Sequence, residues 1–328
     1  MSAAHQQAER TALVTGGTDG IGKEVARGLA RAGHRVIIIG RDAEKGVRAA
    51  REIQQAARNP NVEFLQADLS LMREAERVAD EVGSRWAGLN CLVHSAGMVS
   101  GRRELTDEGI ESNFATNYLS RFVLTRKLLP LMKAVGEPGT AARIVVISGA
   151  ATTGKIYFDD INLTSKFGLL RMVGQSCRAN DVFTVEQARR LASGYARRVT
   201  ITCLKMGVVK TNIRNRPDFP RWMKILVPLI MDPLLGQTAE QAAESALKLL
   251  LSRAYEGVTG ALFLKIREFK QIEPLADLAD PKIGLRLWEL SERLSVSPSN
   301  QLTNQFSQSI AAPSEGDTWK DFGVSHLG

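Results

Sequence analysis

Three glycines near the start of the chain have the spacing of a phosphate-binding turn. Gly16, Gly20 and Gly22 follow an apolar run that begins at Thr11, and they lead into a helical pattern at about residues 21–32. Such glycines let the backbone turn tightly and approach a pyrophosphate, whose charge is stabilised by the amide groups of a helix N-terminus. The spacing therefore predicts a dinucleotide phosphate site, with a plain strand end as the alternative.

Arg41 stands at the end of the second apolar run, residues 35–40. In a dinucleotide-binding fold an acidic residue at this point holds the ribose hydroxyls, whereas a guanidinium grips a 2′-phosphate through two hydrogen bonds. Arg41 therefore favours NADP(H), while NAD(H) stays open. A surface arginine beside Asp42 is the alternative, and the acidic Asp19 in the glycine turn weakens the preference.

The elements that must position these residues are apolar runs alternating with helical patterns. The runs are continuous, as expected for parallel strands that are covered on both faces. They lie at residues 11–15, 35–40, 62–66, 90–94, 143–148, 199–204 and 260–264. We predict an α/β fold with a single Rossmann-type, doubly wound parallel sheet of about seven strands, helices on both faces and a C-terminal extension.

The glycine stretch Thr15-Gly-Gly-Thr-Asp-Gly-Ile-Gly22 resembles the TGxxxGxG cofactor motif of the short-chain dehydrogenase/reductase family. Further matches follow in order to about Gly260 and are nearest to the retinol-dehydrogenase-like branch. The resemblance implies the following cofactor-binding residues: Gly16, Thr18, Asp19, Gly20, Ile21, Gly22, Arg41, Asp68, Leu69, Ala96, Gly97, Asn117, Gly207 and Thr211.

Two of these residues have a second interpretation. Asp68 resembles the family's adenine-binding aspartate, but it also stands where it would cap the helix expected at residues 71–86. Asn117 matches the asparagine of the catalytic tetrad, which in the family bends a helix and holds a proton-relay water. His94 ends the fourth strand and is interpreted as a hydrogen-bonded core histidine rather than a base.

The family's acid–base pair is missing from this chain. Relatives carry Tyr-x-x-x-Lys on one helix face, where the ammonium lowers the tyrosine pKa so that the phenol exchanges protons near neutrality. No tyrosine here has a lysine four residues later. The run at residues 176–191 matches the family's helix and puts Val173 and Cys177 at the two positions, whereas a second register puts Asn162 and Lys166 there.

The catalytic serine of the family is also absent. Its position is Gly149, and Ser148 fills the place before it. We therefore expect Asn117 and Ser148 to be the remnants of the tetrad. If a replacement proton donor exists, the candidates are Tyr157, Asp159, Asp160 and Cys177.

Composition limits the remaining choices. The 328 residues are 44% hydrophobic and 24% charged, which suits a globular chain. The net charge of +8 comes from basic residues scattered among acidic ones, so we expect no nucleic-acid partner. The three cysteines lack metal-ligand spacing, which predicts no metal site and a reducing, cytoplasmic location. No apolar run is long enough for a transmembrane segment.

The expected organisation is one main domain. Residues 1–10 are predicted to be a flexible N-terminus, residues 11–265 the NADP(H)-binding domain, and residues 266–328 a partly flexible C-terminal extension. The apolar stretch at residues 219–231 predicts a substrate lid at about 214–236, with plain packing, a dimer contact or a membrane-surface contact as alternatives.

Three functions fit this sequence. The first is an NADP(H)-dependent enzyme that acts on a bulky hydrophobic small molecule by chemistry that does not need the tyrosine. The second is a redox-neutral cyclase or isomerase that uses the cofactor structurally, and the third is a non-catalytic cofactor-binding or sensor protein. A homo-oligomer is left open.

Overall fold

The computed structural model describes residues 10–135, 141–151, 154–192, 198–210, 229 and 236–296. Contacts divide the chain into one compact unit that ends at Ser295 and a second that begins at Val296. The first unit carries all the helices and strands given below. Most of the predicted lid lies outside the described residues, as do the first nine residues and those from 297 on.

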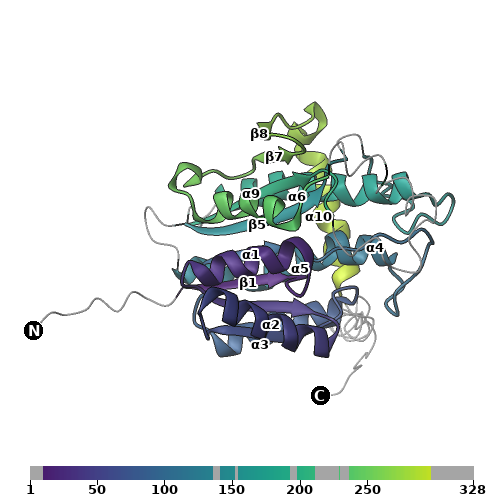
Figure 1. The fold of residues 1–328 in the computed structure, drawn as a ribbon. Coiled ribbons are helices and arrows are strands. Elements are labelled where there is room, and N and C mark those ends of the chain that lie inside the picture. The colour runs from purple at the N-terminus through teal and green to yellow at the C-terminus, as the bar shows by residue number, and fades with distance from the viewer. Residues whose placement is uncertain are drawn as a thin grey trace, which may run out of the picture. The chain divides into compact units, whose positions relative to one another are not determined.

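One sheet runs through the first unit, and within the described residues it has eight strands in the order β3-β2-β1-β4-β5-β6-β7-β8 (Figure 1). Strands β1 to β7 are parallel, and β8 pairs antiparallel with β7. The strands are β1 (Thr11–Thr15), β2 (Arg35–Gly40), β3 (Val62–Gln66), β4 (Cys91–His94), β5 (Ala142–Gly149), β6 (Val199–Met206), β7 (Leu262–Lys265) and β8 (Phe269–Ile272).

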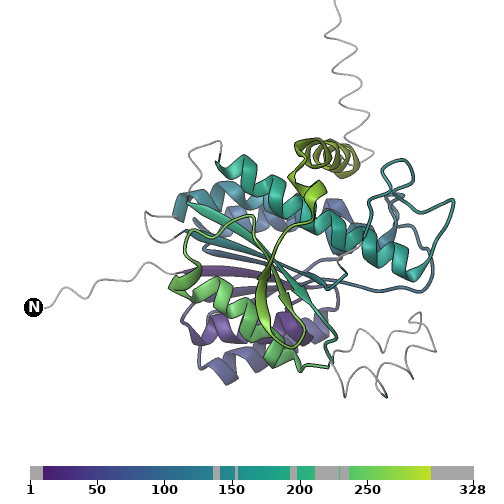
Figure 2. The ribbon, with the colours of Figure 1, turned by 90° about the horizontal axis from the view of Figure 1, so that it is seen from above.

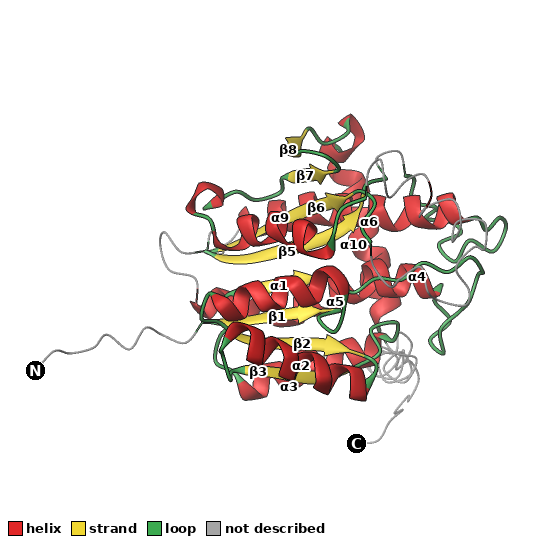
Figure 3. Ribbon diagram, in the orientation of Figure 1, coloured by secondary structure: helices red, strands yellow, loops and turns green. Residues whose placement is uncertain are grey.

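Helices cover both faces of this sheet (Figures 2 and 3). The longer helices are α1 (Gly20–Arg31), α2 (Ala43–Ala57), α3 (Met72–Arg85), α5 (Ser120–Val135), α6 (Leu169–Ala192), α9 (Ala239–Leu251) and α10 (Pro281–Ser295). The short elements are α4 (Ser112–Phe114), η1 (Ala115–Leu119), η4 (Arg253–Tyr255) and η5 (Ala276–Ala279). None of the helices in the described ranges combines the length and the apolar character needed to cross a bilayer.

Two apolar layers form because neighbouring strand residues point to opposite faces of the sheet. Leu13 of β1 contributes to a core with α3, α5, α6 and α10, while Val14 contributes to a core with α1, α2 and α9. Both residues are fully buried. Burial on both faces explains why the strands read as continuous apolar runs in the sequence.

The predicted doubly wound sheet is confirmed, with one addition. Strand β8 lies beyond the predicted seven strands, where the sequence resemblance fades. Strand β1 sits between β2 and β4, and the chain leaves this centre outward in both directions. Ligands of such sheets bind at the carboxyl ends of the strands beside this reversal of direction. The carboxyl ends of β1 and β4 are therefore where a nucleotide site is expected.

Candidate functional site

The glycine turn after β1 leaves no room for side chains. Gly16 has φ of 66°, and a Cβ there would lie 2.8 Å from Cα of Ala96. A Cβ on Gly22 would lie 2.4 Å from the carbonyl oxygen of Gly16. Thr15 Oγ1 accepts hydrogen bonds of 3.0 Å from the backbone amides of Ser95 and Ala96. The ends of β1 and β4 are thus tied together beside the N-terminus of α1.

A cavity of about 460 Å³ opens at this point. It lies at the strand ends where the topology predicts a ligand. Most of the predicted cofactor residues line it: Gly16, Thr18, Asp19, Gly20, Ile21, Gly22, Arg41, Asp68, Leu69, Ala96 and Gly97. The other lining residues were not predicted to bind the cofactor; they are Ile39, Gly40, Asp42, Lys45, Ala67, Ser95, Met98 and Thr116.

The remaining predicted cofactor residues do not line this cavity. Asn117 follows the lining residue Thr116, and its side chain is bound to the backbone of Met98. Gly207 follows β6, and its amide donates to the carbonyl of Lys265 at 2.8 Å. Thr211 lies outside the described residues.

Asp19, which weakened the cofactor preference in the sequence, has a cation beside it. Its carboxylate accepts from the amide of Gly20 at 2.7 Å as the N-cap of α1, and Lys45 Nζ of α2 lies 2.5 Å from it. Arg41 has no carboxylate within ion-pair distance among the described residues. The contact between Lys45 and Asp19 could not be predicted from the sequence, because it depends on how α2 packs beside the glycine turn.

The interpretation of Asp68 as the N-cap of α3 is wrong. The N-cap of this helix is Leu71, which makes no side-chain hydrogen bond. The carboxylate of Glu108 binds the first amides instead, accepting from Met72 at 2.6 Å and from Arg73 at 3.1 Å. Asp68 accepts from the amide of Ser70 and faces the cavity.

Asn117 lies in a π-helical turn, η1, between α4 and α5. Its Oδ1 accepts from the Met98 amide at 2.7 Å, and its Nδ2 donates to the Met98 carbonyl at 2.8 Å. Its own carbonyl accepts from Asn180 Nδ2 at 3.0 Å. The π-helical turn lies where the family resemblance implies a helix bend, and the carbonyl of Asn117 within it is bound by Asn180.

The structure supports the first of the two registers for the missing pair. Cys177 lies within α6, and a Cβ built on Gly149 would be 3.1 Å from its Sγ. Asn162 and Lys166 come before α6 begins, and Asn162 binds the backbone of Glu111 and Gly109. Asn162 and Lys166 thus lie outside α6, whereas Cys177 of α6 lies against Gly149 at the end of β5. The assignment of the pair to Val173 and Cys177 stays a prediction.

The remnant Ser148 and the position Val173 lie close to these residues in the chain. Ser148 is buried next to the end of β5 and is paired in register with Lys205 of β6. Val173 is half-buried in the second turn of α6. Neither Gly149 nor Val173 carries a group that titrates.

Two of the four proposed replacement donors, Asp159 and Asp160, have their carboxylates engaged elsewhere. The Asp159 side chain is 94% exposed and pairs with Arg286 at 2.7 Å. Asp160 accepts from the hydroxyls of Ser165 and Thr164, which lower its carboxyl pKa. The Arg171 guanidinium lies 3.6 Å from the ring centre of Tyr157. Cys177, which is 4% exposed, is the candidate that lies against a tetrad position.

His94 is a core histidine, as interpreted from the sequence. It is fully buried, and its Nε2 shares a hydrogen bond of 2.8 Å with Thr125 Oγ1. Burial, and then the charge of Arg121, lower its pKa well below the usual value. The ring is neutral at physiological pH.

A buried polar cluster beneath the strand ends was missed by sequence reasoning. It consists of Arg121 of α5, Asn180 and Asp181 of α6, and Cys203 and Lys205 of β6. Lys205 Nζ lies 2.6 and 2.8 Å from the two carboxylate oxygens of Asp181. Arg121 shares the helical spacing of the buried Leu124 and Leu128, so a cation in an apolar stripe was the available signal.

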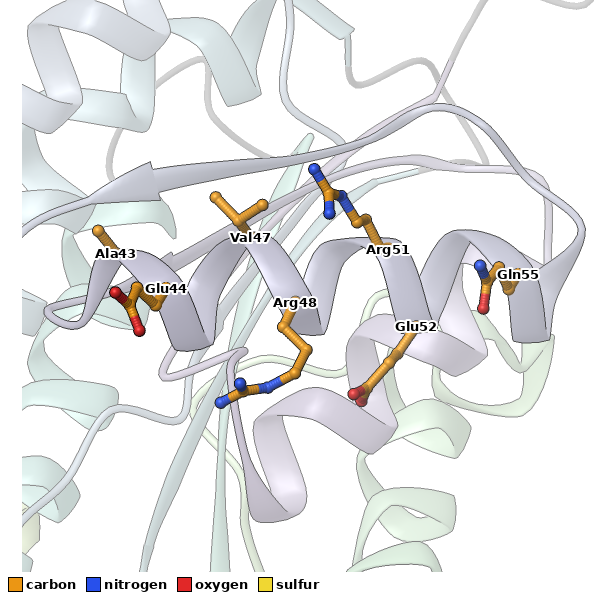
Figure 4. Close-up of a pocket in the computed structure, with 7 residues that line it drawn as sticks. All are labelled: Ala43, Glu44, Val47, Arg48, Arg51, Glu52 and Gln55. Carbon is orange, nitrogen blue, oxygen red and sulfur yellow. The ribbon is translucent and has the colours of Figure 1, made fainter.

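A larger hollow, of about 550 Å³, lies along α2 (Figure 4). All its lining residues belong to that one helix: Ala43, Glu44, Val47, Arg48, Arg51, Glu52 and Gln55. A single helix face encloses no ligand, and Glu52 is already paired with Lys23. No group of three or more metal-ligating side chains comes together among the described residues.

Comparisons with known proteins agree with the geometry. The family model for short chain dehydrogenases matches residues 10–218. Human polyprenol dehydrogenase is 31% identical over 284 residues, covering 86% of this chain and 84% of the relative. Human retinol dehydrogenase 14 is 32% identical over 297 residues, covering 86% and 85%.

Solved structures with this fold are also similar. The Pseudomonas aeruginosa RhlG/NADP active-site complex has a TM-score of 0.62 and 26% identity, covering 80% of this chain and 97% of that chain. A protein from Mycobacterium Paratuberculosis has a TM-score of 0.66 and 27% identity, covering 88% and 94%. The chain belongs to the short-chain dehydrogenase/reductase family, in its retinol-dehydrogenase-like branch.

Proposed function

We propose that this protein is an NADP(H)-binding enzyme that reduces a bulky hydrophobic small molecule without a tyrosine proton donor. The observation that carries the proposal is the cavity at the glycine turn, beside tetrad positions that hold Gly149, Val173 and Cys177. The cradle suits a dinucleotide because side chains at Gly16 and Gly22 would collide with backbone. The N-terminus of α1 presents amides to its phosphates.

The preference for NADP(H) over NAD(H) rests on charge. Arg41 lines the cavity and has no carboxylate partner within the described ranges, so its guanidinium is available for a 2′-phosphate. Lys45 offsets the charge of Asp19, which would otherwise repel that phosphate. Because Lys45 is paired with Asp19, the charge of Arg41 remains at this end of the cavity to favour the phosphorylated cofactor.

A hydrophobic substrate is supported by the relatives whose names refer to retinol and polyprenol. NADPH, when bound, supplies a hydride. Reducing a carbonyl also requires a proton at oxygen, and the phenol that the family uses for this is absent. A carbon that is already cationic, such as an iminium carbon, needs no proton. We therefore propose that an activated, electron-poor carbon is the acceptor.

The test is an NADPH oxidation assay with matched iminium, activated-alkene and carbonyl substrates of similar hydrophobic bulk. We expect the iminium to be reduced and the carbonyl to react at least 10²-fold more slowly, because general acid–base catalysis contributes roughly 10² to 10⁴ in rate. Hydride addition to the alkene leaves a carbanion that needs a proton, so the alkene should also react more slowly than the iminium. The triple variant Gly149→Ser/Val173→Tyr/Cys177→Lys should gain carbonyl reduction. If none of the three substrates causes NADPH to be consumed, the proposed reductase activity is refuted.

One contact favours a second candidate, a redox-neutral cyclase or isomerase that uses the cofactor structurally. The family asparagine that matches Asn117 holds a relay water, and here the Asn117 carbonyl accepts a hydrogen bond from Asn180. A redox-neutral isomerase or cyclase predicts product formation with unchanged nicotinamide absorbance. Stoichiometric loss of NADPH during turnover would exclude it.

A further inference from the structure

Arg121 is a buried cation that contacts the backbone of a residue lining the candidate cavity. Its side chain lies in α5 and the residue is 4% exposed. Its Nη2 donates to the carbonyl of Ala96 at 2.9 Å, and its Nη1 donates to the carbonyl of Ile147 at 2.8 Å and to Asn180 Oδ1 at 3.3 Å. Burial lowers its pKa to about 10, which leaves the guanidinium charged at neutral pH.

The groups around Arg121 do not cancel this charge. No carboxylate lies within ion-pair distance of it among the described residues. Asp181 is committed to Lys205, and that pair is neutral overall whichever partner holds the proton. Burial raises the pKa of the Cys203 thiol and lowers that of His94, so both are neutral. One uncompensated positive charge therefore remains below the strand ends.

The carbonyls that Arg121 binds identify which part of the site lies nearest to it. Ala96 lines the cofactor cavity after β4, and Ile147 directly precedes Ser148 and Gly149 at the end of β5. The family resemblance gives Gly149 as the position of the catalytic serine, so we expect the reacting nicotinamide ring to lie beside it. The Arg121 guanidinium binds the backbone of Ile147, two residues before this position, and also the backbone of Ala96 beside the glycine turn.

We propose that Arg121 makes this site select the reduced cofactor, because its fixed charge disfavours the cationic nicotinamide of NADP⁺ relative to the neutral ring of NADPH. The inference rests on the proposed cofactor binding. A buried charge acts across a medium of lower effective dielectric than water, and we expect an effect of roughly tenfold on the ratio of the two affinities. The phosphates are the same in both forms, so they cancel in the ratio.

The test is to measure Kd for NADPH and for NADP⁺ with the full chain by calorimetry. The wild type should bind NADPH about tenfold more tightly than NADP⁺. Arg121→Met should bring the ratio of the two Kd values towards one, while Arg121→Lys, which keeps the charge, should preserve it. Arg126→Gln is the matched control, because it removes one positive charge from the half-exposed face of the same helix and should leave the ratio unchanged.

Arg121 could instead serve only to brace β4, β5 and α6, and the ratio separates the two roles. If Arg121 is only a brace, Arg121→Met should weaken the binding of NADPH and of NADP⁺ by the same factor. Arg121→Lys should then behave like Arg121→Met. Wild-type protein that binds NADP⁺ as tightly as NADPH would overturn the inference even if the Met variant does not fold. If the protein binds neither nucleotide, the proposed function itself is overturned.

Discussion

At the scale of single residues, the glycines of the turn allow the sharpest comparison. Gly22→Ala should abolish nucleotide binding or lower stability, because its Cβ would lie 2.4 Å from the Gly16 carbonyl oxygen. Gly83→Ala, in α3, meets nothing within 4 Å and should stabilise the fold by about 0.5–1 kcal/mol. Urea unfolding of both variants, with NADPH titration, checks the pair. Equal effects from the two substitutions would contradict the geometry.

The buried pair of Lys205 and Asp181 gives a second prediction at this scale. Lys205→Met should destabilise the protein by roughly 3–5 kcal/mol, since it leaves a carboxylate buried without its cation. The double variant Asp181→Leu/Lys205→Met should recover most of that loss, because no charge is then buried. Urea unfolding curves of the single and double variants measure the recovery. A double variant no more stable than the single one would refute this assignment.

At the scale of elements, helix α10 contributes to the core although it lies beyond the family match. Its Trp288 ring packs 4.9 Å from the ring of Phe122 in α5 and lies 3.8 Å from the guanidinium of Arg190 in α6. Ser291 shares a hydrogen bond of 2.7 Å with the phenol of Tyr118, next to Asn117. The helix therefore supports the turn that carries the tetrad asparagine.

Trp288→Ala should accordingly lower the free energy of unfolding by about 2–4 kcal/mol. Leu285→Ala, at a position of the same helix that is 49% exposed, should change it by less than about 0.5 kcal/mol. Thermal or urea unfolding distinguishes the two. If both substitutions lower the free energy of unfolding by less than about 0.5 kcal/mol, α10 does not stabilise the domain.

The elements that the sequence predicted are those with a local pattern. Continuous apolar runs indicated the parallel strands, and the glycine turn indicated the cavity. Strand β8 has partly exposed residues and only four positions, so its pattern was too weak. The contacts of Lys45 and Glu108 join segments far apart in the chain, and nothing local in the sequence reports them. For Arg121 the apolar stripe indicates burial, but its contacts depend on the packing of distant segments.

At the scale of the whole molecule, buried histidines set a pH dependence. Burial lowers the pKa of His94 and of His34, so the folded chain stays unprotonated where the unfolded chain takes up protons, below about pH 6.5. Stability should therefore fall from pH 7.5 to 5.5, by up to about 1.4 kcal/mol per pH unit for each histidine.

The variant His94→Gln isolates one of these contributions. Its free energy of unfolding should depend less steeply on pH than that of the wild type, whatever its value at pH 7.5. Urea unfolding at several pH values gives both slopes. An identical slope would show that His94 is protonated in the folded chain.

The cofactor-binding and catalytic positions differ in how closely this sequence matches the family at each. Most of the predicted binding residues line one cavity, whereas the positions to which the resemblance assigns the acid–base residues hold Gly149, Val173 and Cys177. The departures could be read directly, because each is a change of residue type within a matched motif. The polar cluster beneath them could not, since it forms only when α5, α6 and β6 pack.

The most direct test of this account is a titration of the purified full chain with NADPH and with NADH. We predict that NADPH binds at least about tenfold more tightly, and that Arg41→Ala removes this difference without abolishing NADH binding. Failure to bind either nucleotide, or tighter binding of NADH by the wild type, would contradict it.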